Sequence, residues 1–314
     1  MTTAIVSLGA ACAAAAGLHV YEHFAGQHPV FDALYDLRLR GKDLDGLDRR
    51  NLANPRRSDV IVTLTTLPSR IDRTAPTLKS LLNQTVSPAA IRLNVPTFSR
   101  REQCAYTIPD WLRRLRSVTI CACDDYGPAT KLIPALLGAP PEQRLLVVDD
   151  DRIYHRHLVA QMTSQSDAHP DIAVAGSGWN APADLIDRPS TLRATLGGLP
   201  PVPLHCTRAG QGIEVDMVRG VSGYLVKPRF FDLAALIDYG HAPSAAFFVD
   251  DVWISAHCRA RKVVLPGRRT NFASLADAGF FEPSSLGAIN CTGEDALRNN
   301  TVMLQYFADR WHAR

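Results

Sequence analysis

The stretch RLLVVDDDRIYHRHL (144–158) places four apolar residues, 145–148, directly before three consecutive aspartates, Asp149, Asp150 and Asp151. Such an apolar run, followed at once by polar residues, is typical of a buried strand that ends at the edge of a sheet. Neighbouring carboxylates repel and raise one another's proton affinity, so a positive partner is expected nearby. If strand alternation continues through the aspartates, Asp149 and Asp151 share one face and Asp150 points away.

The segments around this stretch alternate between two patterns. Strands are predicted at 59–67, 90–95, 117–123, 144–149 and 171–177, with helices at 74–84, 109–116, 129–137 and 156–166 between or after them. Alternation at this spacing predicts an α/β fold with a parallel sheet and helices on both faces. Ligands of such sheets bind outside the carboxyl ends of the strands, which makes the three aspartates candidate site residues.

The second half of the chain is less regular. Residues 180–212 are rich in Pro, Gly and polar residues and predict long irregular connections. Order is predicted to return at 213–228, as two short strands around Gly220 and Gly223. We then expect a helix at about 229–238, a strand running into a helix at 246–261, and a last helix at 294–311.

Composition limits the classes of protein that the chain can belong to. With 314 residues, 46% of them apolar and 21% charged, it can bury a substantial globular core. A net charge of +3 without a dense basic run argues against nucleic-acid binding. Seven scattered cysteines form neither a zinc pattern nor a disulfide framework, which favours a reduced, cytoplasmic protein.

The N-terminal residues 2–18 are apolar and uncharged but rich in Ala and Gly, and no basic residues precede them. They are at the short limit for crossing a bilayer, so we expect a buried strand–helix piece in preference to a signal peptide or membrane helix. Association with a membrane surface stays open.

A D-x-D at a strand end suits a divalent cation held against a diphosphate. Carboxylate oxygens are ligands for Mn²⁺ or Mg²⁺, which leaves Asp149 and Asp151 as candidate metal ligands. The metal would neutralise the carboxylates and stabilise the charge on a departing diphosphate. The alternative is an Asp-rich turn that caps the following helix.

Two further segments carry candidate site residues. FFVDDVWIS (247–255) repeats the pattern with Asp250 and Asp251, either of which could cap a helix or act as a general base. DDYGPATKL (124–132) contains Lys131, which could reach a phosphate or be a solvated surface lysine. The segment lacks the spacing of a P-loop.

Together these segments resemble a glycosyltransferase of the GT-A fold, of the family-2-like inverting type, over about residues 58–270. The resemblance is carried by IVTLTTLPSR (61–70), LLVVDDD (145–151), VSGYLVKP (221–228) and FVDDVWISAHCRARK (248–262). It implies a Rossmann-like, mostly parallel sheet with helices on both faces. It divides the chain into an N-terminal extension (1–57), the glycosyltransferase domain (58–270) and a C-terminal helical tail that packs on it (271–314).

The resemblance also implies roles, position by position. In the donor nucleotide pocket it places Thr65, Thr66, Arg70, Asp125, Lys131 and Asp149. It makes Asp151 a metal ligand together with Asp149, and Asp251 the catalytic base, with Asp250 as second choice. Gly223, Tyr224 and Trp253 would border the acceptor and donor sugars. The chain departs from the family in having Asp-Asp where many members have Glu-Asp, and TLPSR where Y/F-N is common.

The implied activity is metal-dependent transfer of a sugar from a nucleotide diphosphate, with a UDP-sugar favoured, to a hydroxyl of a saccharide or glycolipid, as in polysaccharide biosynthesis. Single displacement would invert the anomeric configuration. One alternative is a nucleotidyltransferase or phosphate-ester hydrolase using Mg²⁺ at strand-end carboxylates. Another is a non-catalytic carbohydrate-binding protein.

The first 57 residues fall outside this resemblance. IVSLGAAC (5–12) and PVFDAL (29–34) resemble the start of a papain-like cysteine peptidase family. That resemblance would make Cys12 a nucleophile, which needs a histidine partner that the sequence does not identify. We therefore expect a remnant or a packing extension here.

Overall fold

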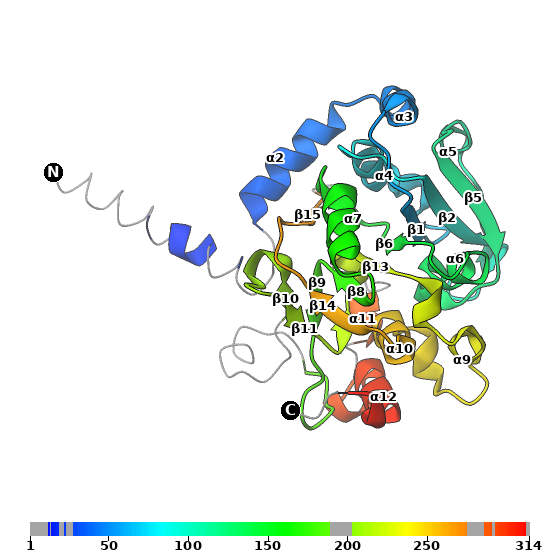
Figure 1. The fold of residues 1–314 in the computed structure, drawn as a ribbon. Coiled ribbons are helices and arrows are strands. Elements are labelled where there is room, and N and C mark those ends of the chain that lie inside the picture. The colour runs from blue at the N-terminus through cyan, green and yellow to red at the C-terminus, as the bar shows by residue number, and fades with distance from the viewer. Residues whose placement is uncertain are drawn as a thin grey trace.

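The computed structural model describes residues 12, 14–18, 22, 28–188, 203–274, 286–290 and 293–311. Its centre is an eight-stranded sheet in the order β11-β14-β8-β13-β6-β1-β2-β5 (Figure 1). The bounds are β1 Ile61–Thr65, β2 Ala90–Pro96, β5 Val118–Cys123, β6 Leu145–Val147, β8 Ile172–Ala175, β11 Ile213–Glu214, β13 Tyr224–Val226 and β14 Arg261–Val264.

The sheet is mostly parallel, which confirms the predicted α/β class. Strands β6, β1, β2 and β5 run parallel, and so do β8 and β14. Strand β13 lies between β6 and β8 and is antiparallel to both, and β11 is antiparallel to β14 at the edge. Smaller sheets pair β10 (Leu204–His205), β9 (Ser177–Trp179) and β12 (Met217–Val218), β15 (Asn271–Ala273) and β7 (Arg152–Tyr154), and β3 (Phe98–Ser99) and β4 (Cys104–Ala105).

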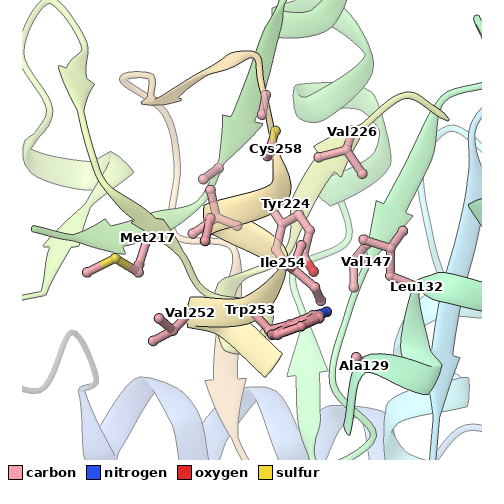
Figure 2. Packing of buried hydrophobic residues seen from close by; sticks show 14 of the residues in the cluster. Ala129, Leu132, Val147, Met217, Tyr224, Val226, Val252, Trp253, Ile254 and Cys258 are labelled. Atoms are coloured by element: carbon pink, nitrogen blue, oxygen red, sulfur yellow. The ribbon is translucent and has the colours of Figure 1, made fainter. Parts of the chain in front are cut away.

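Helices cover both faces of the sheet (Figure 1). Their bounds are α2 Pro29–Arg40, α3 Leu44–Ala53, α4 Ala75–Leu82, α5 Asp110–Arg113, α6 Ile133–Leu137, α7 Leu158–Ala168, α9 Leu233–Ile237, α10 Asp250–His257, α11 Leu286–Asn290 and α12 Asn299–Tyr306. Alternate residues of β6 enter different cores, as the pleat requires. Leu145 and Val147 pack in the cluster around α6, α10 and α12, part of which Figure 2 shows, whereas Leu146 packs with α4 and α7. Burial on both faces explains why the strand is an uninterrupted apolar run.

Two predicted elements differ from the structure. The segment before Asp250 is not a strand: residues 244–247 form a 3₁₀ turn in which the N–H of Ala246 donates to the carbonyl of Pro243. The aromatic and β-branched composition indicated a strand, but these side chains enter the core as a turn that leads into α10. The predicted helix at 294–311 is regular only as α12, with a 3₁₀ turn on each side.

The N-terminal residues contain helices that the sequence reading did not predict. Helix α2 packs against β15, and α3 packs against α4. Asp48 of α3 is buried and accepts hydrogen bonds from the backbone N–H groups of Arg116 (3.0 Å) and Ser117 (2.8 Å). No helix in the described parts of the chain is long and apolar enough to cross a membrane. The division into domains stays a prediction, and most of the piece expected at 2–18 lies outside the described residues.

Candidate active site at the edge of the sheet

The centre of the candidate site is one ammonium group among three carboxylates. Lys131 Nζ lies 2.7 Å from Asp149 Oδ1, 2.6 Å from Asp250 Oδ2 and 3.9 Å from Asp251 Oδ1. Lys131 keeps only 6% of its surface exposed. A buried ammonium must be paired, and here the end of β6 and the start of α10 supply the partners. Lys131 is thus a positive partner for both acidic motifs, the one that begins at Asp149 and the one that begins at Asp250.

Local structure in DDYGPATKL directs Lys131 inward. Gly127 has φ +61°, and a Cβ on it would lie 2.2 Å from the carbonyl oxygen of Phe247, so this turn needs glycine. The Thr63 hydroxyl of β1 donates to the Lys131 carbonyl at 2.6 Å. Asp125 holds the loop itself, because its carboxylate accepts the N–H groups of Gly127 (2.8 Å) and Arg100 (2.6 Å). The predicted contact of Asp125 with a nucleotide stays a prediction.

Arg70 compensates the other two aspartates. Its Nη2 lies 3.1 Å from Asp150 Oδ1 and 3.0 Å from Asp151 Oδ2, and the Thr66 hydroxyl donates to Asp150 Oδ2 at 2.6 Å. The prediction that Asp150 points away from Asp151 is therefore wrong. Strand β6 ends at Val147, and the N–H of Asp149 bonds to the Tyr154 hydroxyl, so alternation does not continue through the aspartates.

Burial and like charges raise the pKa of three of these carboxyls, those of Asp149, Asp150 and Asp251. Burial, with the charge of Asp250 second, raises the pKa of Asp251 to about 7, although Lys131 acts in the opposite direction. Burial likewise raises the pKa of Asp149, and that of Asp150 to about 6 against the effect of Arg70. For Lys131, burial alone would lower the pKa, but the three aspartates together raise it well above its ordinary value.

Exposure separates the two acids of α10. The Asp251 side chain is 31% exposed, whereas that of Asp250 is 10% exposed and lies against Lys131. A base must reach the proton that it removes. Of the pair, Asp251 is therefore the one that a substrate hydroxyl could approach.

Gly220 closes the site from the side of β13. Its N–H donates to Asp251 Oδ1 at 3.3 Å, and its carbonyl accepts from the Tyr154 hydroxyl at 3.2 Å. A Cβ at this position would lie 2.5 Å from both Asp149 Oδ1 and Lys131 Nζ. The ion pair and a side chain larger than hydrogen cannot occupy this space together.

Two arginines that sequence reasoning missed lie close to the acidic centre. Arg219 precedes Gly220, and burial lowers its pKa against the influence of Asp251, with the charge of Arg152 adding to the lowering. Its guanidinium makes no hydrogen bond or ion pair with another described residue. Arg152 Nε lies 3.5 Å from Asp151 Oδ1. Nothing in the sequence marks these arginines, because only the fold brings β7 and the turn before β13 to the same edge.

The remaining predicted residues lie mostly in the core. Trp253, which Figure 2 shows among the buried residues of the core, is 1% exposed. It donates from Nε1 to the Leu236 carbonyl at 3.0 Å and stacks on Tyr239. Tyr224 is also fully buried, and its hydroxyl has no hydrogen-bond partner among the described residues. Both rings are buried in the core, and their predicted role at the sugars stays a prediction.

Gly223 and Thr65 lie near the site without contributing a free polar group. Gly223 has φ +74°, a conformation that favours glycine, and it leads into β13. The Thr65 hydroxyl donates to the Asn94 carbonyl at 2.8 Å. Their predicted roles at the sugar and the nucleotide stay predictions.

The carboxylates have the right chemistry for Mn²⁺ or Mg²⁺, but their arrangement does not fit either ion. Among the residues that the structure describes, no group of three or more His, Cys, Asp or Glu side chains could hold a metal ion. Two carboxylates with substrate phosphates can suffice for Mg²⁺. Here, however, Asp149 is paired with Lys131, and Asp151 with Arg70 and Arg152. A metal bound by these two aspartates would have to displace those cations.

The peptidase-like segment gives no second site. Residues 5–11 lie outside the described part of the chain, and Cys12 is exposed. Asp32 of PVFDAL is buried in α2, where it pairs with Arg269 at 3.2 Å. A nucleophilic role for Cys12 has no support among these residues.

Comparisons with known proteins give limited information. No protein-family model matches the chain, and no curated protein matches it. Among solved structures, S. aureus TarS 1–349 is 12% identical with a TM-score of 0.43, over 68% of this chain and 59% of that one. The same TarS fragment in complex with UDP is 15% identical, with a TM-score of 0.43 over 80% and 71%. The mannosyltransferase PcManGT from Pyrobaculum calidifontis, in complex with GDP-Man and Mn²⁺, is 17% identical, with a TM-score of 0.43 over 79% and 66%. Similarity this low says nothing about what the chain binds.

Proposed function

We propose that this chain is a glycosyltransferase of the GT-A type, moving a sugar from a nucleotide diphosphate to a hydroxyl of a saccharide or glycolipid. The observation that carries the proposal is Asp251, a carboxylate at the start of α10 that is partly exposed and has a pKa raised to about 7. A general base works best when its pKa lies near the working pH. Perturbed carboxyls at a sheet edge are also where an α/β fold places its chemistry.

Asp251 would take the proton of the acceptor hydroxyl. The acceptor oxygen then attacks the anomeric carbon from the side opposite the diphosphate, and the bond from that carbon to the diphosphate oxygen breaks. This single displacement inverts the anomeric configuration. A positioned base contributes ~10²–10⁴-fold to such a step. Lys131 positions the acids by pairing with Asp149 and Asp250, and Asp250 is the less accessible second choice for the base.

The donor would bind at the same edge, with its diphosphate against Arg219 and Arg152. Guanidinium groups suit phosphate oxygens because they donate two parallel hydrogen bonds. Arg219 is suited to this role because the described part of the chain gives it no hydrogen-bond or ion-pair partner, and the charges of Asp251 and Asp149 are near enough to raise its pKa against the effect of burial. Thr66 and Arg70, at the end of β1, would border the nucleotide, for which UDP is favoured over GDP.

The predicted Mn²⁺ or Mg²⁺ has no role in the proposed steps, because the arrangement of the carboxylates fits neither ion. With Asp149 and Asp151 paired as described, the proposed steps use the cations of the chain itself. A glycolipid acceptor would bring a cytoplasmic enzyme to a membrane surface, and polysaccharide biosynthesis is the process in which such transfers occur.

The test is release of nucleoside diphosphate from UDP-sugars and GDP-sugars, with simple saccharides as acceptors. We expect release of UDP or GDP by the wild type and a loss of about 10²-fold or more in Asp251→Asn. Asp309→Asn, a change at an exposed aspartate, is the matched control. Release of a sugar 1-phosphate in place of a nucleoside diphosphate would instead favour the hydrolase or nucleotidyltransferase alternative. Equal release by the wild type and Asp251→Asn would remove Asp251 as the base.

A further inference from the structure

A hollow that is separate from the candidate active site lies between helix α3 and the body of the protein. Its volume is about 360 Å³. Helix α3, the end of α4 and the segment between β7 and α7 form its walls, through Leu47, Arg50, Asn51, Asn54, Arg56, Leu82, Asn83, Gln84, Thr85 and Arg156. Half of these residues belong to residues 1–57, the part of the chain that the proposed function leaves without a role.

The charge of this hollow is one-sided. Three arginines line it, Arg50, Arg56 and Arg156, and no aspartate or glutamate does. Lys42 is close enough for these charges to affect its pKa. Burial lowers the pKa of Lys42, and the charges of Arg50 and Arg156 lower it further. Cations gathered around a hollow repel one another unless an anion enters it.

Three side-chain amide oxygens of the walls already accept hydrogen bonds, whereas two arginine side chains have no bonded partner among the described residues. Asn83 Oδ1 accepts from Lys42 Nζ at 2.9 Å, Asn54 Oδ1 from the N–H of Arg56 at 3.0 Å, and Gln84 Oε1 from a backbone N–H at 3.0 Å. The guanidinium groups of Arg56 and Arg156 bond to no other described residue. A ligand with several acceptor oxygens fits such a hollow, and a ligand rich in donors does not.

The walls are held before any ligand arrives. Asn54 Nδ2 donates to the Ser87 hydroxyl at 3.0 Å, and the N–H of Thr85 donates to the Arg156 carbonyl at 2.8 Å. Arg57 ties α3 to the sheet side, with Nη1 on the Asn51 carbonyl at 3.1 Å. Fixed walls lower the entropy cost of binding, since only the arginine side chains need to become ordered.

We propose that this hollow binds a small phosphorylated molecule, with its phosphate held by Arg56 and Arg156. The volume accommodates a phosphate joined to a sugar or a similar ring. The site is separate from the Lys131 cluster and independent of the proposed transfer reaction. Helix α4 links the two, because Thr77 in its first turn bonds to the Asp150 carbonyl at 2.7 Å and Leu82 at its end lines the hollow.

The test uses the full chain and inorganic pyrophosphate, titrated by calorimetry at constant ionic strength in the presence of saturating UDP and GDP to occupy a donor site. We expect binding by the wild type, weakened about tenfold or more in the double variant Arg56→Gln/Arg156→Gln, because two charge-assisted hydrogen bonds are lost. Arg49→Gln is the matched control, since Arg49 is on the same helix but outside the hollow and is 74% exposed. Asp251→Asn should bind pyrophosphate as the wild type does, whether or not the proposed transfer function holds.

Two results would overturn the proposal. One is wild-type affinity in the double variant, and the other is absence of binding by the folded wild type at millimolar pyrophosphate. Melting temperatures equal to that of the wild type would show that the variants are folded, as expected for exposed arginines without partners.

Discussion

At the scale of single residues, the aspartates at the end of β6 are compensated by cations of the chain itself. Lys131 forms ion pairs with Asp149 and Asp250, and Arg70 forms ion pairs with Asp150 and Asp151. Removing one member of a buried ion pair leaves the other charge uncompensated. The proton affinity of Asp251 therefore depends on Lys131 as well as on its own burial.

The pH dependence of transfer should report this coupling. Because Asp251 must be deprotonated to act as a base, kcat/KM of the wild type should rise with pH through about 7. Lys131 lowers the pKa of Asp251, so Lys131→Met should move this limb to higher pH. Activity measured between pH 5 and 9 checks both statements. A limb that moves to lower pH in the variant would contradict the assignment.

Gly220 offers a test of the geometry without a change of charge. The Cβ of Gly220→Ala would meet the tips of the Lys131 and Asp149 side chains, which can move, so the protein should still fold. Activity should fall because the ion pair must separate. Gly41→Ala is the control, since a Cβ there meets nothing within 4 Å. Enzyme kinetics and the melting temperature should be measured for both variants. Loss of folding in Gly220→Ala, or equal activity of Gly220→Ala and Gly41→Ala, would contradict this account.

Sequence reasoning found part of this site. Asp149, Asp251 and Lys131 follow apolar strands or a Gly-Pro turn, and such local patterns can be recognised without a structure. The pairing of Lys131 with both acidic segments, and the positions of Arg219 and Gly220, depend on contacts between segments far apart in the chain. An arginine before a glycine has no local pattern that separates it from a surface arginine.

At the scale of elements, the buried strands were predictable and the N-terminal helices were not. Helix α2 buries Asp32 and Asp36 and exposes Phe31, Leu34 and Leu37, the reverse of the pattern by which helices are recognised. The prediction of a strand at 246–249 was wrong for another reason. The aromatic and β-branched composition of this segment suits a strand, but residues 244–247 form a 3₁₀ turn that buries Ala245 and Ala246 and leads into α10.

Helix α3 should stabilise the sheet domain through one carboxylate. Asp48→Ala would remove a buried carboxylate and leave the N–H groups of Arg116 and Ser117 without their acceptor, and should lower the free energy of unfolding by about 1–3 kcal/mol. Asp45→Ala, at an exposed position on the same helix, should cost less than about 1 kcal/mol. Urea unfolding measures both. If the two variants lowered the free energy of unfolding equally, the hydrogen bonds of Asp48 would not stabilise the segment before β5.

At the scale of the whole molecule, the acidic cluster should cost stability. The folded pKa of Asp251 lies above its unfolded value, so the folded state binds a proton more tightly, and this contribution to stability is lost as pH rises through about 7. Asp251→Asn removes the charge. Its melting temperature should therefore exceed that of the wild type at pH 8, with a smaller difference at pH 5. A variant that melts below the wild type at pH 8 would show that the charge stabilises the fold.

The arrangement of helices around the sheet explains why the candidate site lies at the ends of the strands. Helices bury both faces, so the polar groups that the fold can offer to a ligand gather where strands end. The overall α/β class followed from the alternation of apolar strands and helices, which is a property of the sequence itself. The antiparallel strand β13, which carries Gly220 to the site, could not be predicted because strand order depends on long-range pairing.

The most direct test of the account is a calorimetric titration of the wild type, Asp151→Asn and Arg219→Gln with UDP and with GDP, each with and without Mn²⁺. The account predicts that one nucleotide binds the wild type and that Arg219→Gln weakens this binding about tenfold or more. Binding that requires Mn²⁺ and is lost in Asp151→Asn would establish the predicted metal ligand. If neither nucleotide binds the folded wild type under either condition, the carboxylate edge is not a donor site and the central claim is wrong.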